Sequence, residues 1–206
     1  MSETTGDFDM ELPNLGDDRP GLEELDDDLD VEEVDEDGDD DYDDYPDDAT
    51  DDDIDLVLAL YREDGQPVVL ALDAELANDF DSLIDQLRRI PGDGGALGMV
   101  SLATEVFVLV RVRGKHVQVL LSDVGAADDW PIARDLVDYL GIDTDEDDDD
   151  AYPVGDLEIL VDSGLHDYEL EAIASNYDED SVTLLEQIAE RVKFGREFSR
   201  AVAALD

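Results

Sequence analysis

The chain has 206 residues, of which 62 are acidic and 12 are basic, so its formal net charge is −50. A surface this acidic repels phosphates, which argues against direct nucleic-acid binding and makes basic proteins the natural electrostatic partners. The chain contains no cysteine, which excludes disulfides, zinc thiolate sites and cysteine nucleophiles.

Neither a membrane span nor a signal peptide is visible in the sequence. No apolar run reaches the length of a membrane-spanning helix, and the first residues lack the basic and apolar regions of a secretion signal. We therefore expect a cytoplasmic protein that does not contact membranes.

Residues 1–53 have the composition of an acidic tail. They contain 27 acidic residues and a single basic one, Arg19, whereas residues 54–206 contain 35 acidic and 11 basic residues. A segment with so few apolar residues cannot offset the entropy of ordering, so we expect residues 1–53 to be disordered. Its scattered leucines allow an alternative, in which a short amphipathic helix forms against a partner. Residues 54–206 are then a single α+β domain, with an acidic loop at 143–151.

The domain begins with two strands and a helix. The pattern predicts a strand over residues 54–61, a hairpin turn at Asp64-Gly65 and the returning strand over residues 67–72. Asp79 is a candidate N-cap for a helix that ends at Pro91-Gly92, and its apolar positions recur at spacings of three and four: Phe80, Leu83, Ile84, Leu87 and Ile90. A glycine-rich loop then leads into a strand over residues 96–102.

The longest β-rich run, residues 106–123, predicts a central hairpin. Glycine at the first loop position suits a type II′ turn at Gly114-Lys115, because glycine accepts a positive φ. This turn fixes the register, and the pairs on one face are Val112 with Val117, Val110 with Val119, and Val108 with Leu121. On the other face Leu109 faces Leu120, Arg111 faces Gln118, and Phe107 faces Ser122.

A second amphipathic helix follows the hairpin. Asp128 or Asp129 is its expected N-cap, Pro131 lies in its first turn and Gly141 ends it, with a buried stripe of Ile132, Leu136, Val137 and Leu140.

The remaining residues are mostly helical. We expect a short strand at residues 157–160, a helix over 167–176, another that starts at Asp180 or Ser181, and a break at Gly195 before a last turn with Phe198, Val202 and Leu205. The fold class is α+β: an antiparallel sheet of about five strands backed by helices, with a small C-terminal helical unit.

No motif for catalysis or cofactor binding stands out. Residues 33–44 approach the spacing of an EF-hand loop, but Glu33 begins it, Asp44 ends it and no amphipathic helices flank it. The glycine loop at 92–95 precedes a strand and lacks the phosphate-binding pattern. A serine triad requires Ser101 or Ser122 near His116 or His166, and no nucleophile motif is present. We expect no enzyme activity, cofactor or metal site.

Six residues are candidates for partner contacts. Arg111, Arg113, Lys115 and His116 form the only dense basic cluster, at the hairpin tip, where they neutralise the chain's own acidic runs or contact an acidic partner or an RNA phosphate. The sole tryptophan, Trp130, is either a core residue at a helix start or an exposed contact residue, and Arg134 follows it on the same helix.

Several segments, in order, resemble the actinobacterial tRNA adenosine deaminase-associated proteins. These are GALGMVSL (95–102), VFVLVRVRG (106–114), VLLSDVGAADDWPIARDLV (119–137), PVGDLEILVDSGL (153–165) and IAERVKFGREFSRAV (188–202). The resemblance covers roughly residues 54–205. It implies association with the deaminase that converts the wobble adenosine of tRNA to inosine, and it implies no catalytic residues. The chain lacks the H-x-E and P-C-x-x-C zinc elements of the deaminase, so it is not that enzyme.

The sequence thus predicts a non-enzymatic accessory protein that docks by its acidic surface on a basic partner, tRNA adenosine deaminase in the first place. Two alternatives stay open: an acidic nucleic-acid mimic that inhibits another basic protein, and an enzyme of unrecognised type. The sequence indicates no oligomeric state.

Overall fold

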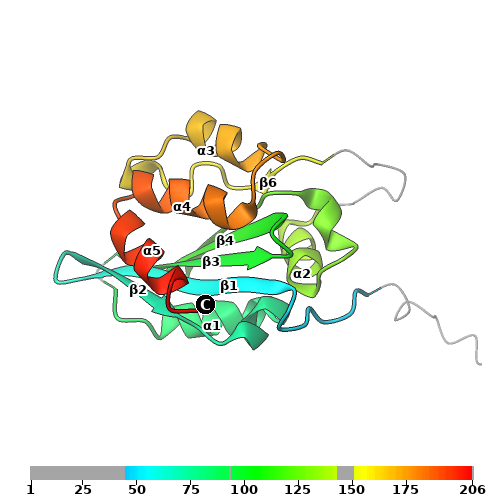
Figure 1. Ribbon diagram of the computed structural model, residues 1–206, viewed down its shortest axis with the longest axis horizontal. Helices are drawn as coiled ribbons and strands as arrows, with labels where there is room; N and C mark the ends of the chain where they lie inside the picture. Colours follow the sequence, from blue (N-terminus) through cyan, green and yellow to red (C-terminus); the bar gives the residue numbers. More distant parts are fainter. Residues whose placement is uncertain (1–44, 93, 143–150, 206) are drawn as a thin grey trace, which may run out of the picture. The chain divides into compact units, whose positions relative to one another are not determined.

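A computed structural model describes residues 45–92, 94–142 and 151–205 of the chain. The described part contains a six-stranded antiparallel sheet with the order β2-β1-β3-β4-β5-β6 (Figure 1). The strands are β1 (Ile54–Glu63), β2 (Gln66–Ala71), β3 (Ala96–Leu102), β4 (Val106–Arg113), β5 (His116–Leu121) and β6 (Val154–Gly155). The expected α+β class is confirmed, with one strand more than the five expected.

Within the described segments, five helices and three short 3-10 helices accompany the sheet. The helices are α1 (Phe80–Arg88), α2 (Pro131–Leu140), α3 (Asp167–Ala174), α4 (Ser181–Arg191) and α5 (Gly195–Val202). The 3-10 helices are η1 (Ala74–Asn78), η2 (Val124–Ala127) and η3 (Val161–Ser163).

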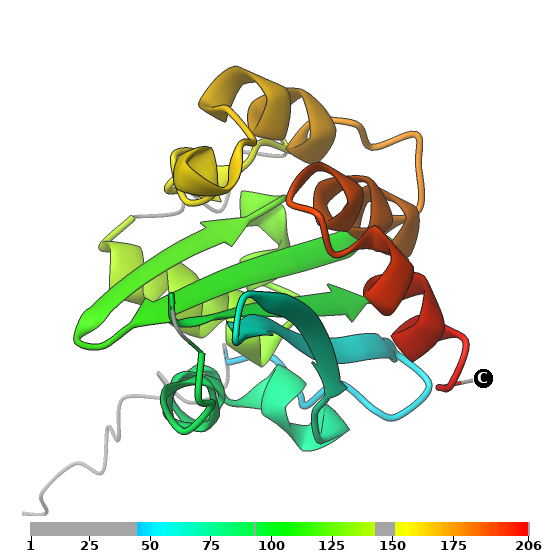
Figure 2. The same ribbon diagram turned by 90° about the vertical axis from the view of Figure 1, so that its left-hand side faces the viewer.

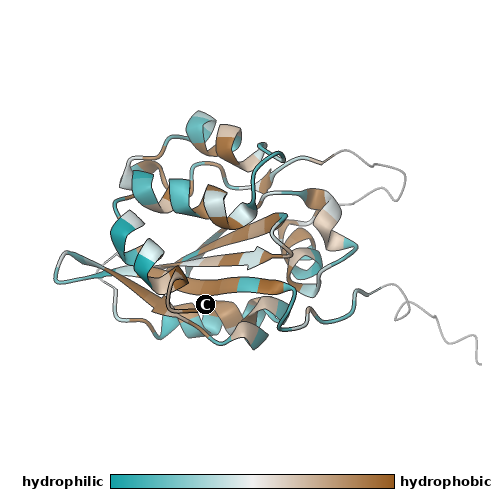
Figure 3. Ribbon diagram, in the orientation of Figure 1, coloured by the Kyte–Doolittle hydropathy of each residue, from teal (hydrophilic) through white to brown (hydrophobic). Residues whose placement is uncertain are grey.

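Helices cover both faces of the sheet, so the domain has three layers and two apolar cores (Figure 2). The first core lies between the sheet and helices α1 and α2, and the second lies between the sheet and helices α3, α4 and α5. The strands are predominantly apolar, whereas the helices alternate apolar and polar residues (Figure 3). Phe107 and Leu109 of β4 are fully buried in the second core, so the C-terminal helices cover this face of the sheet.

The register of the central hairpin is as predicted. Val112 faces Val117, Val110 faces Val119, and Val108 faces Leu121, while Leu109 and Arg111 face Leu120 and Gln118 on the other side. The turn glycine, Gly114, has a φ of 60°. Since side chains alternate along a strand, the valine pairs enter the first core and the leucine pair enters the second.

The β1–β2 hairpin also turns where the sequence indicated. Asp64 and Gly65 have φ values of 51° and 76°, the left-handed values that a two-residue type I′ loop requires. Asp79 caps α1 as predicted, because its carboxylate accepts a hydrogen bond from the N–H of Ser82 at 2.8 Å.

The start of helix α2 corrects a prediction. Neither Asp128 nor Asp129 is its N-cap; this position belongs to Trp130, which makes no side-chain capping bond, and Pro131 is the first helical residue. The reason is the short helix η2, which occupies residues 124–127, is capped by Asp123 and ends at Asp128. Gly141 ends α2 in the left-handed conformation as predicted, with a φ of 65°.

Two expectations for the C-terminal part were wrong. The short strand lies at Val154–Gly155 and not at residues 157–160, because Asp156 starts a turn there. The carboxylate of Asp156 accepts a hydrogen bond from the N–H of Glu158, and its backbone carbonyl accepts one from the N–H of Ile159. The break before the last helix is at Lys193, which has a φ of 71°, and Gly195 begins α5 instead of ending α4. Asp180 caps α4 as predicted.

Residues 45–53 lie against the domain. Ala49 is buried in the first core, and its N–H and C=O both form hydrogen bonds with the amide of Asn78, at 2.8 and 2.9 Å. The hydroxyl of Tyr45 donates to Asp135 of α2 at 2.7 Å. The division into a disordered tail and a domain stays a prediction, as do the EF-hand-like segment and the acidic loop, because residues 1–44 and 143–150 lie outside the described residues.

Candidate interaction surfaces

The predicted basic cluster divides into two parts, and the first is an ion-pair network. Arg111 binds the carboxylate of Asp162 through two hydrogen bonds of 2.5 and 3.1 Å, and it also donates to the carbonyl of Ile159 at 2.6 Å. Arg113 donates to the same carboxylate at 2.8 Å. The Arg111 guanidinium, whose side chain is 12% exposed, holds the pKa of Asp162 below its usual value.

The network continues along strand β5. Arg113 donates to the side-chain oxygen of Gln118 at 2.7 Å, and the amide nitrogen of Gln118 donates to Asp156 at 2.6 Å. These bonds join β4 and β5 to the segment that follows β6. Arg111 and Arg113 therefore hold a loop of their own domain in place through a single acidic residue, and not through an acidic run.

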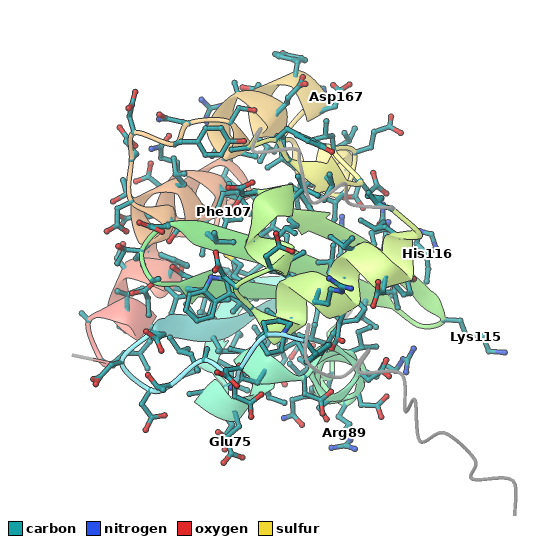
Figure 4. The ribbon with its side chains drawn as sticks, turned by 90° about the vertical axis from the view of Figure 1, so that its right-hand side faces the viewer. Glu75, Arg89, Phe107, Lys115, His116 and Asp167 are labelled. Atoms are coloured by element: carbon teal, nitrogen blue, oxygen red, sulfur yellow. The ribbon has the colours of Figure 1, made fainter. Side chains whose placement is uncertain are left out.

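Lys115 and His116 form the second part and are exposed. Lys115 extends away from the tip of the β4–β5 hairpin, and His116 lies beside it at the start of β5 (Figure 4). A role of these two residues in contacts with a partner stays a prediction.

Trp130 and Arg134 do not join the basic cluster. Trp130 is half-buried at the start of α2, packs against the first core and faces the β3–β4 turn, at the opposite end of β4 from the hairpin tip. An eight-residue strand is about 26 Å long, so the tryptophan and the tip are well separated. Arg134 is half-exposed one turn further along the same helix.

The structure places Trp130 in a groove that the sequence did not reveal. The groove has a volume of about 500 Å³ and lies between the β3–β4 turn, η2 and the segment before α4. Its lining includes two aromatic residues, six acidic residues and no lysine or arginine: Trp130, Tyr177, Glu105, Asp123, Asp129, Asp178, Glu179 and Asp180. We call it the acidic groove.

Several groups of the acidic groove are held in place. Asp123 and Asp180 are the N-caps of η2 and α4. Glu179 accepts a hydrogen bond from Gln187 at 2.7 Å. Burial and the nearby Asp123 carboxylate raise the pKa of Tyr177, whose side chain lines the groove. Carboxylates beside aromatic faces attract arginine and lysine, through ion pairs and through the negative potential of the rings.

No signal in the sequence could have located this groove. Its acidic residues come from segments up to 75 positions apart, from Glu105 to Asp180, and look like any others in a chain with 62 of them. Trp130 stands out in the sequence only as the single tryptophan. The remaining lining residues come together through the pairing of β3 with β4 and the capping of α4.

The described residues show no constellation for metal or nucleophile chemistry. Within them, no three His, Asp or Glu side chains are grouped to hold a metal ion. The Ser101 hydroxyl is bonded to Asp55 and Ser181, and the Ser122 hydroxyl accepts from the N–H of Phe107, so neither bonds a histidine. No helix of the described segments is long and apolar enough to span a membrane.

Comparison with known proteins agrees with the resemblance seen in the sequence. The family model of the Rv3753c-like tRNA adenosine deaminase-associated proteins matches residues 55–195. The chain belongs to this family.

Protein Rv3753c of Mycobacterium tuberculosis strain H37Rv, a relative, is 30% identical over 151 residues, which cover 72% of this chain and 87% of that protein. No solved structure matches the chain. As a member of the deaminase-associated family, the chain carries both the ion-pair network and the acidic groove within the matched range. Residues 1–54 and most of α5 lie beyond it.

Proposed function

We propose that this protein is a non-catalytic accessory protein of tRNA adenosine deaminase, which it binds by placing its acidic surface on the basic, tRNA-binding face of the enzyme. The family description supplies the association with the deaminase. The proposed mode of binding rests on the acidity of the domain, since residues 54–206 contain 35 acidic and only 11 basic residues. A face that binds tRNA phosphates is positive, so it is complementary to such a surface.

The ion pairs within the domain support this mode of binding. Four of the basic residues, Arg88, Arg111, Arg113 and Arg191, are paired with carboxylates of the same chain. Such pairs reduce the positive charge presented to a partner, while the acidic residues remain in large excess. We expect the acidic groove to be a principal contact, because it combines six carboxylates with two aromatic rings.

Two consequences for the enzyme follow from this proposal. Both the accessory protein and tRNA would bind the same basic face, so they compete, and added tRNA releases the protein. Until then the bound protein covers a highly charged surface and keeps the enzyme soluble. Both events belong to the cytoplasm, and residues 1–53, with a net charge of −26, would add a long-range attraction.

The proposal is tested by measuring the affinity of the purified protein for the deaminase of the same organism by calorimetry at several salt concentrations. We expect the affinity to fall steeply as salt rises, and tRNA to displace the protein. A matched acidic control protein of similar charge should bind much more weakly. Absence of binding at low salt would overturn the proposal. Equal binding to several unrelated basic proteins would favour the nucleic-acid mimic.

A further inference from the structure

Strand β2 forms one edge of the sheet and carries no charged residue. The strand reads Gln66-Pro-Val-Val-Leu-Ala71, without a single charged residue, whereas 36% of the whole chain is charged. Natural proteins usually protect edge strands with charges, prolines, bulges or very short length. The opposite edge, β6, is only two residues long.

The register shows which backbone groups of β2 face outward. The N–H of Leu72, opposite Val57, donates to the carbonyl of Val57 at 2.9 Å, so this pair is a hydrogen-bonded pair of the ladder. In antiparallel pairing hydrogen-bonded and non-bonded pairs alternate, so Leu70, Val68 and Gln66 bond to β1 as well. Pro67, Val69 and Ala71 therefore direct their backbone groups away from the sheet.

Pro67 agrees with this assignment, because it occupies an outward position where no N–H is needed. The open edge thus presents the N–H groups of Val69 and Ala71 and the carbonyls of all three residues. Within the described residues, these N–H groups have no hydrogen-bond acceptor. Leu70 is 44% exposed beside them, and its side chain offers apolar contact area.

Acidic residues bound the edge at both ends. Glu63 and Asp64 lie at the β1–β2 turn, and Asp73 and Glu75 follow the end of β2, all of them exposed. A second copy of this chain would bring the same four carboxylates and its own large negative charge to the edge, which opposes self-pairing. A strand with an uncharged middle and basic ends is complementary to it.

We infer that β2 is a docking edge at which an extended segment of the basic partner, uncharged in the middle and flanked by lysine or arginine, adds a seventh strand to the sheet. This inference rests on the proposed function and specifies one part of that contact. Main-chain hydrogen bonds to Val69 and Ala71 would supply directional binding, which the long-range charge attraction alone does not provide.

The test uses the full chain and the deaminase as the probe. Ala71→Pro removes one outward N–H without breaking a bond to β1, and the Ala71 side chain is exposed, so the fold should survive. Ala71→Thr keeps the N–H and is the matched control. Thermal melting of both variants verifies folding. We expect Ala71→Pro to weaken binding to the deaminase by about tenfold and Ala71→Thr to bind like the wild type.

Hydrogen exchange gives a second readout. Binding should slow exchange of the Val69 and Ala71 amides at least about tenfold, and should affect the Leu70 amide, which already bonds to β1, much less. If the wild type binds, but Ala71→Pro binds equally well and the two amides are not protected, the inference is overturned and the proposed function stands. If the wild type does not bind the deaminase, both fail. If the amides are protected in the free protein and Ala71→Pro changes its oligomeric state, a second copy occupies the edge and the inference is wrong.

Discussion

The hydroxyl oxygen of Ser101 on strand β3 lies 2.7 Å from that of Ser181 at the start of helix α4, and both residues are fully buried. Ser101 donates its proton to the carboxylate of Asp55 at 2.8 Å, so Ser181 is the donor to Ser101. The same carboxylate accepts from the N–H of Thr104, and the Thr104 carbonyl accepts from the N–H of Ser181. This chain of bonds attaches α4 to the end of the β3–β4 hairpin.

We predict that Ser101→Ala lowers the free energy of unfolding by about 1–3 kcal/mol, because it leaves the buried Ser181 hydroxyl without its acceptor and the Asp55 carboxylate with only the Thr104 N–H. Urea denaturation measures the change. The double variant with Ser181→Ala should cost less than the sum of the single variants, since the two hydroxyls act on each other. Thr183→Ala, at an exposed position of α4, is the control and should change stability by less than about 0.5 kcal/mol. Strict additivity would contradict direct coupling.

We predict that Asp162→Asn destabilises the domain at neutral pH by up to about 1 kcal/mol, because Arg111 and Arg113 lose their shared carboxylate. The pKa of Asp162 is lowered in the folded state, so its contribution is present above the unfolded-state pKa. It is lost as the pH falls through the lower, folded-state pKa. The stability difference between wild type and variant should therefore shrink in acid.

Urea denaturation at a series of pH values between about 2 and 7 measures this difference. Glu171→Gln, at an exposed position of α3, removes the same charge away from the network and is the control. A difference for Asp162→Asn that is independent of pH would show that the ion pairs do not stabilise the fold.

We predict that the double reversal Asp129→Lys with Asp178→Lys weakens binding to the deaminase by about fivefold or more, because both residues line the acidic groove. The salt dependence of the affinity should also become less steep. The control variant reverses Glu171 and Glu190 instead, two exposed residues on α3 and α4, and so changes the net charge by the same amount. Equal losses in both variants would mean that net charge, and not the acidic groove, determines binding.

Tyr45 provides a prediction for the segment that precedes β1. Burial, the hydrogen bond to Asp135 and the Asp135 charge raise the pKa of its phenol to about 12. A raised phenol pKa stabilises the fold below the unfolded-state value near 10, and this contribution disappears as the pH rises through about 12. We expect Asp135→Asn to move the tyrosinate absorbance transition of Tyr45 to lower pH. The transition that is missing in the Tyr45→Phe variant is the one that belongs to this residue. An unchanged transition would contradict the contact.

The sequence was sufficient for the parts of the fold that short-range patterns determine. The hairpin register followed from one glycine and the alternation of valines, and the caps at Asp79 and Asp180 followed from single side chains before periodic runs. The start of α2 did not follow, because η2 inserts an extra turn whose residues have no distinctive pattern.

The surfaces were harder to predict than the fold. Arg111 and Arg113 look like exposed strand residues until the loop that carries Asp162 folds over them. Tyr177 and Trp130 are 47 positions apart and share the groove only through the tertiary structure. Contacts of this kind depend on long-range chain geometry, and no local propensity reports them.

The two cores are completed at different times during protein synthesis. Strands β1 to β5 and helices α1 and α2 are all made by residue 140, and together they contain nearly all of the first core. The second core is still incomplete at this point, because the helices that cover Leu58, Met99 and Phe107 begin only at residue 167. The nascent chain therefore carries a bare apolar sheet face for some time, which favours aggregation. The strongly negative residues ahead of it emerge first, and we expect their mutual repulsion to keep neighbouring nascent chains apart.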